Sequence, residues 1–96
     1  MAAEYPIKFR ILQLFKDGEP HWNNEIVTQL QAEYDMAGDY GRDSINFDII
    51  EVAAGGMIKE IEVMIDADGI YKKGALLHRY EVTPFGLDRL KDCLIK

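Results

Sequence analysis

The sequence predicts a single α+β domain over residues 1–96, with three helices before a β-hairpin and a fourth helix after it. Three observations predict this class. Residues 43–56 have the apolar spacing of a helix and end at a glycine pair. From Met57 to residue 65 the spacing changes to the alternation typical of a strand. Thr83-Pro84 then provides a helix start, because threonine caps a helix and proline fits its first turn.

Composition limits the classes of protein to consider. A chain of 96 residues with 48% hydrophobic and 29% charged residues is ordinary for one soluble globular domain. The lone Cys93 excludes an internal disulfide, and no signal peptide or membrane-crossing apolar run is visible, so we expect a cytoplasmic protein. The net charge of −6 opposes binding to nucleic acid over the chain as a whole.

The first two predicted helices each have one apolar face. The first begins at Pro6, ends at Asp17-Gly18 and places these residues on one side: Ile7, Ile11, Leu14 and Phe15. The second begins near Asn23 or Asn24, either of which can cap it, and its apolar stripe contains Ile26, Val27, Leu30 and Tyr34. Trp22 is expected to pack back onto this stripe as a hydrophobic staple rather than to stack on a ligand.

The third predicted helix follows a loop. Residues 35–42 contain two glycines and two acids and so predict a loop, longer than the turn of the tightest helix-turn-helix units. Asp43 or Ser44 then caps the helix, whose inward face holds Ile45, Ile49, Val52 and Ala53. Phe47 and Ile50 fall on the outward face, where they have no place in the same core.

The hairpin and the last helix complete the prediction. Ile61, Val63 and Ile65 are expected to form the half-buried face of the first strand, before a turn at residues 66–69. Leu76–Val82 is the predicted return strand. In the closing helix, the apolar face is expected from Leu87, Leu90 and Leu94.

This order of elements is that of a winged helix-turn-helix domain, and two motifs resemble small prokaryotic proteins of that family. In those proteins a Gly-Leu-Ile-like step leads into the wing, and a Tyr-x-Leu-Thr-x-x-Gly-x-x-x-Leu run leads out of it. Gly56-Met57-Ile58 matches the first motif, and the second is matched by Tyr80, Val82, Thr83, Gly86 and Leu90. With residues 11–18 and 24–30 the likeness covers nearly the whole chain. It implies a DNA-binding transcription regulator, often dimeric, with the third helix in the major groove.

The resemblance leads to a predicted surface for double-stranded DNA. It consists of Arg42, Ser44, Asn46, Phe47, Lys72, Lys73 and Arg79. Ser44 and Asn46 would read base edges, because asparagine can pair with adenine through two hydrogen bonds. The basic residues would contact phosphates, although Lys72 and Lys73 fit a solvated hairpin tip equally well. Asp43, Asp48 and Glu51 oppose such binding.

A second hypothesis is an acidic winged-helix module that contacts proteins and does not bind DNA. Phe47 and Ile50 on one helix face would mark a protein contact, unless residues 35–42 or the first helix bury them. Leu90 and Leu94 on the closing helix could pair with the same helix of a second copy, which would give a homodimer.

The sequence predicts neither an enzyme nor a cofactor or metal site. His21, His78 and Cys93 lack the spacing of metal ligands. Asp66-x-Asp68-Gly69 resembles the start of a calcium loop, but the twelfth residue is Leu77 instead of the required glutamate. Glycine-rich phosphate loops and nucleophile motifs are absent from the sequence.

Overall fold

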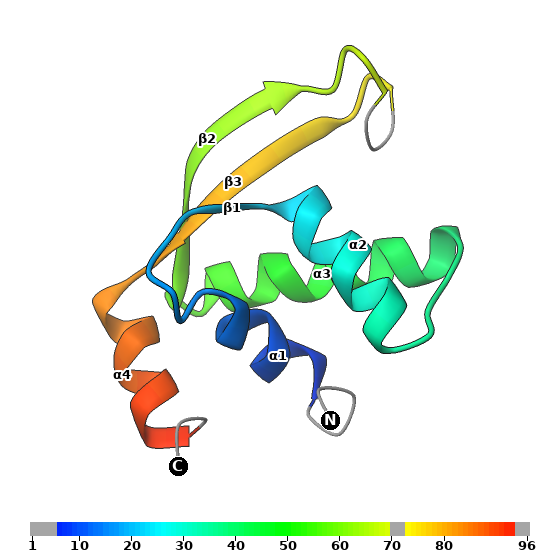
Figure 1. Cartoon of the computed structure of the whole chain (residues 1–96). Helices are drawn as coiled ribbons and strands as arrows, with labels where there is room; N and C mark the ends of the chain where they lie inside the picture. Colours follow the sequence, from blue (N-terminus) through cyan, green and yellow to red (C-terminus); the bar gives the residue numbers. More distant parts are fainter. Residues whose placement is uncertain (1–5, 70–72, 94–96) are drawn as a thin grey trace.

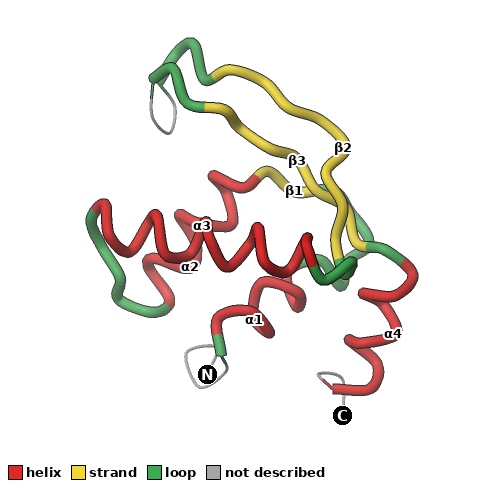
Figure 2. The backbone as a smooth tube through the Cα atoms, turned by 180° about the vertical axis from the view of Figure 1, so that it is seen from behind, coloured by secondary structure: helices red, strands yellow, loops and turns green. Residues whose placement is uncertain are grey.

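The computed structural model describes residues 6–69 and 73–93, which form four helices and a three-stranded antiparallel sheet (Figure 1). The elements are, in order, α1 (Ile7–Leu14), β1 (His21–Trp22), α2 (Asn23–Glu33), α3 (Asp39–Ala54), β2 (Ile58–Ile65), β3 (Leu76–Val82) and α4 (Pro84–Cys93). The predicted α+β class is confirmed, and the arrangement is compatible with a winged-helix-like one. In Figures 1 and 2, α2 and α3 lie between α1 and the far part of the hairpin, and α4 follows directly from the near end of β3.

The core lies between α1, α2 and α3 and is closed by the near ends of the hairpin and α4. Its buried residues are Ile11, Leu12, Phe15, Ile26, Val27, Leu30, Ile45, Ile49, Val52, Ile58, Tyr80 and Leu90. The helical members recur three or four residues apart, so each helix buries one stripe. The inward faces predicted for the second and third helices are therefore confirmed at their central positions, Ile26, Val27 and Leu30 in α2 and Ile45, Ile49 and Val52 in α3.

The sheet has the order β1-β3-β2, and its first strand was not predicted. In β1, His21 pairs with Tyr80 and Trp22 pairs with Arg79. A bulge between Glu60 and Glu62 interrupts the pairing of β2 with β3. Beyond this bulge the hairpin leaves the core, and all residues of β2 after Ile58 are exposed. The half-buried strand face that we predicted is wrong, because Ile61, Val63 and Ile65 are all exposed.

The third helix begins earlier than predicted, at Asp39, so neither Asp43 nor Ser44 caps it. Gly38 occupies the N-cap with a φ of +94°, and Gly41 lies inside the helix. A Cβ atom at Gly41 would lie 2.1 Å from the carbonyl oxygen of Met36, so glycine is needed for the α2–α3 connection to pack against α3. The second glycine of this segment therefore marks a close approach of two backbones rather than a loop.

The cap predicted for the last helix is confirmed. The hydroxyl oxygen of Thr83 accepts the N–H of Gly86 at 3.0 Å, and the hydroxyl lies 2.6 Å from the carbonyl oxygen of Gly56. A Cβ atom at Gly86 would lie 2.1 Å from the carbonyl oxygen of Met57. Residues of the two motifs described above, before β2 and after β3, are thus in direct contact.

The start of α2 differs from the prediction in two ways. Neither asparagine is the N-cap. Trp22 holds that position, and its backbone N–H donates to Oε1 of Glu25 at 3.2 Å. Asn23 is buried and contacts α3 and β3 instead. Trp22 faces the hairpin rather than the stripe of α2, since β1 pairing places it beside Arg79, whose guanidinium lies 5.9 Å from the indole.

Candidate interaction surface

The outward side of α3 carries an apolar stripe formed by Tyr40, Phe47, Ile50 and Ala54, which we call the α3 stripe. The exposed fractions of Tyr40, Phe47 and Ile50 are 86%, 59% and 52%. Their spacing of seven, three and four residues places them on one side of a helix. The α2–α3 connection packs at Gly41, on another side of α3, so it does not bury the stripe. The burial that we considered for Phe47 and Ile50 is therefore excluded.

The charges beside the α3 stripe are mostly negative. Arg42 is the only Lys or Arg in the sequence of α3, and its guanidinium lies 3.0 Å from Asp39 and 3.1 Å from Asp43. The carboxylates of Asp39 and Asp43 thus pair with Arg42, one of the residues expected to contact phosphate. Further along, Glu51 forms an ion pair with Lys8 of α1 at 2.6 Å. Burial raises the pKa of Asp48 above its ordinary value, the nearby Lys8 lowers it, and Glu51 raises it.

The two residues predicted to read base edges are half-buried. Asn46 uses its side-chain oxygen within the protein, where it accepts a hydrogen bond from Nδ2 of Asn23 at 3.1 Å. That oxygen is the acceptor that a bidentate contact with adenine needs. Ser44 lies one helical turn before Asp48 on the same helix and is also only partly accessible. Neither side chain is presented as freely as the neighbouring Phe47.

The basic residues predicted on the hairpin have different environments. Arg79 lies 3.2 Å from Oε1 of Glu62 and beside the indole of Trp22, so its charge is offset within the sheet. Lys73 is exposed just before β3. Lys72 lies outside the described residues. Among the three predicted basic residues that the structure describes, Arg42 and Arg79 each pair with a carboxylate, and Lys73 has none within residues 6–69 and 73–93.

The far part of the hairpin exposes more apolar surface than we predicted. Val63, Ile65 and Leu76 are 44%, 63% and 53% exposed. Ile65 pairs with Leu76 across the strands, and Val63 pairs with His78, so these side chains share one face of the hairpin. Alternation of apolar residues along a strand indicates a face but does not show whether another element covers it.

Leu90 and Leu94 of the closing helix were expected to form a homodimer, and the structure describes only the first of them. Leu90 is 1% exposed and belongs to the core, so the prediction that it contacts a second copy is wrong. Leu94 lies outside the described residues. Phe85 and Leu87 are instead exposed, at 53% and 41%. Leu87 was expected on the buried face, but the packing of α4 against the core turns it outward.

The described residues contain no group of three or more His, Cys, Asp or Glu that could hold a metal ion. Within the same ranges, no helix is both long and apolar enough to span a membrane. No protein-family model, curated protein or solved structure matches the chain.

Proposed function

We propose that this chain is an acidic, winged-helix-type module that binds a protein partner through the α3 stripe. The observation that carries the proposal is the exposure of Tyr40, Phe47 and Ile50 along one side of α3. Large apolar side chains gathered on one face are typical of protein contacts, and aromatic residues are enriched there. The exposed apolar face of the hairpin, which contains Val63, Ile65 and Leu76, supplies a second surface of the same kind.

Electrostatics support a protein partner over DNA. Asp39, Asp43, Asp48 and Glu51 bring four carboxylates to α3, against the single cation of Arg42. A helix that enters the major groove approaches phosphates on both sides, and the electrostatic part of the affinity comes from Lys and Arg side chains that neutralise them. A protein partner with an apolar or basic surface meets no such repulsion.

Replacement of Phe47 by aspartate tests this proposal. Phe47→Asp should abolish a complex isolated after chemical cross-linking in the source cells, because a charge would be buried in the interface. Phe85→Asp on α4 is the matched control, since the wild-type exposures of 59% and 53% are similar. Both variants should keep the urea midpoint of the wild type. A complex that survives Phe47→Asp would contradict the proposal.

DNA binding is the second candidate function. The arrangement of α2, α3 and the hairpin, which is compatible with a winged helix, and the exposed Lys73 favour it. Binding through about three phosphates should weaken roughly 40-fold between about 50 and 200 mM salt. The double variant Lys72→Glu, Lys73→Glu should then abolish binding to random duplex DNA. If the chain instead binds only a protein partner through the α3 stripe, no duplex binding is expected at the lower salt concentration.

A further inference from the structure

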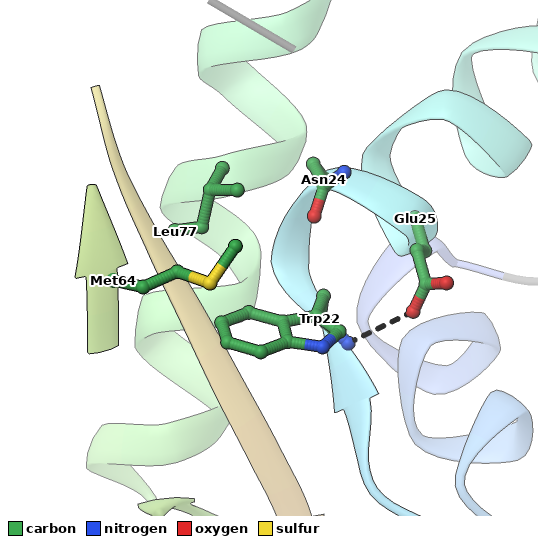
Figure 3. Close-up of a pocket in the computed structure, with 5 residues that line it drawn as sticks. All are labelled: Trp22, Asn24, Glu25, Met64 and Leu77. Carbon is green, nitrogen blue, oxygen red and sulfur yellow. Dashed lines mark hydrogen bonds between the residues drawn. The ribbon is translucent and has the colours of Figure 1, made fainter. Parts of the chain in front are cut away.

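A hollow of about 240 Å³ lies between the first turn of α2 and the hairpin, and we call it the Trp22 hollow (Figure 3). It is lined by Trp22, Asn24, Glu25, Met64 and Leu77. It shares no residue with the α3 stripe, and neither function considered above uses it.

The pairing of the strands brings the apolar walls of the hollow together. Trp22 pairs with Arg79, and Met64 pairs with Leu77, which lies two positions before Arg79 in β3, so these four side chains lie on one face of the sheet. In Figure 3, the Met64 side chain extends toward the indole of Trp22, with Leu77 beside it. The walls formed by Met64 and Leu77 suit a chain of methylene groups.

The hollow offers two hydrogen-bond acceptors, the side-chain oxygen of Asn24 and the carboxylate of Glu25, beside the N–H donors of the Asn24 amide and the Trp22 indole. Oδ1 of Asn24 is buried and receives no hydrogen bond within the described part of the chain, and Figure 3 shows it directed toward the space beside Leu77 and Trp22. A buried acceptor without a donor is costly, so a ligand that donates there gains affinity. The carboxylate of Glu25 adds a negative charge, and its Oε1 also accepts a hydrogen bond from the backbone N–H of Trp22.

The surroundings favour a positive charge. The face of an indole ring attracts cations, and the guanidinium of Arg79, whose buried Nε has no acceptor within the described residues, lies 5.9 Å from the ring of Trp22. Glu62, 3.2 Å from Arg79, offsets the charge of that guanidinium. Glu25 in the first turn offsets the positive end of the α2 dipole. The net charge of −6 raises the concentration of cations near the surface.

We propose that the Trp22 hollow binds a primary alkylammonium group. The methylene chain lies on Met64 and Leu77, and the ammonium donates to Oδ1 of Asn24 close to the carboxylate of Glu25. An ammonium has three donors and no acceptor, so it can donate to Oδ1 of Asn24 and to the carboxylate of Glu25 together. The same chemistry is supplied by a lysine side chain of a protein partner and by a free aliphatic amine. This site does not depend on the function of the α3 stripe.

Nuclear magnetic resonance on the isotope-labelled chain tests the proposal with n-pentylammonium chloride, and n-pentanol is the neutral control of similar shape. The chain has one tryptophan, so its single indole N–H signal reports on the hollow. The amine should shift the signals of Trp22 and Asn24 saturably, with a Kd at least about fivefold lower than that of the alcohol. Equal shifts with both compounds, or none up to roughly 100 mM amine, would overturn the proposal.

Two substitutions test the charge of Glu25 and the side-chain oxygen of Asn24 separately. Glu25→Gln removes the charge but keeps an oxygen that accepts the N–H of Trp22, so α2 should stay capped. Asn24→Leu removes the acceptor at similar volume. Each should raise the Kd of pentylammonium about fivefold. Glu19→Gln, the same change outside the hollow, should leave the Kd unchanged, and an unchanged Kd in Glu25→Gln would contradict the proposal.

A lysine with blocked backbone groups, N-acetyl-lysine N-methylamide, distinguishes the two sources of the ammonium. A Kd equal to or below that of pentylammonium would assign the hollow to a lysine side chain of a protein. A Kd at least about tenfold higher would assign it to a free amine, because the hollow would then exclude a backbone. Either result supports binding of an alkylammonium group in the Trp22 hollow. Failure of both compounds to bind overturns that proposal and leaves the α3 stripe proposal intact.

Discussion

The side-chain amide of Asn23 donates a hydrogen bond to Oδ1 of Asn46 at 3.1 Å, and its own oxygen accepts the backbone N–H of His78 at 2.9 Å. A single residue at the start of α2 therefore joins α3 to β3. Its exposed fraction is 1%, so water cannot easily replace either bond. The relative position of α3 and the hairpin, which present the two exposed apolar surfaces, depends in part on this amide.

We expect Asn23→Ala to lower the free energy of unfolding by about 3 kcal/mol, because the N–H of His78 and the oxygen of Asn46 both lose their partner. Asn46→Ala removes one of these bonds at a half-buried position and should cost about 1 kcal/mol. Urea unfolding followed by circular dichroism measures both values. Equal costs for the two variants would show that the bond to His78 contributes nothing.

The role of Asn23 shows where sequence reasoning is limited. The spacing of Ile11 and Phe15, or of Ile45 and Ile49, predicts a buried face, because helix geometry alone places those residues on one side. An asparagine near a helix start fits a cap equally well whether or not a strand lies beside it. Its actual role depends on β3, which lies 55 residues away in the sequence.

The candidate surface was predictable only in part. The outward direction of Phe47 and Ile50 followed from the helical period. Tyr40 was assigned to a loop because two nearby glycines are an ordinary loop signal, although Gly41 is there for close packing. The engagement of Arg42 by Asp39 became visible only once the helix was known to start four residues earlier.

Gly41→Ala should destabilise the protein by about 2–3 kcal/mol, since the added methyl group would overlap the carbonyl of Met36 and displace the α2–α3 connection. Gly55→Ala is the matched control, because a Cβ there meets its nearest atom at 3.5 Å and its φ of −76° suits alanine. That control should be neutral or stabilise by up to about 1 kcal/mol. Thermal and urea unfolding provide the comparison, and similar stabilities of the two variants would refute the close packing at Gly41.

Thr83→Ala should cost about 1–2 kcal/mol, because α4 loses its cap and the carbonyl of Gly56 loses a donor. Thr83→Ser keeps the hydroxyl and should stay within about 0.5 kcal/mol of the wild type. Hydrogen exchange of the Gly86 amide gives a local measurement, and it should accelerate in the alanine variant alone. Acceleration in both variants would assign the effect to the lost methyl group.

The ion pair between Arg10 and Glu33 predicts a pH dependence of stability. Two bonds of 2.8 and 2.9 Å join α1 to α2, and the Arg10 guanidinium holds the pKa of Glu33 below its ordinary value of 4.5, with a smaller contribution from Gln29. A depressed pKa in the folded state means that the stabilisation is complete above about pH 4.5 and is lost as the pH falls through the lower, folded value.

Glu33→Gln should therefore cost about 1–2 kcal/mol at pH 7, and its difference from the wild type should shrink as the pH falls below 4.5. Urea unfolding at a series of pH values from 7 to about 3 measures this difference. Arg10→Lys keeps the charge but loses the two-bond geometry, so it should reduce the size of the effect and move the pH at which the stabilisation is lost up toward 4.5. A difference that stayed constant down to the lowest pH would show that packing of the Glu33 side chain, rather than its charge, stabilises the contact between α1 and α2.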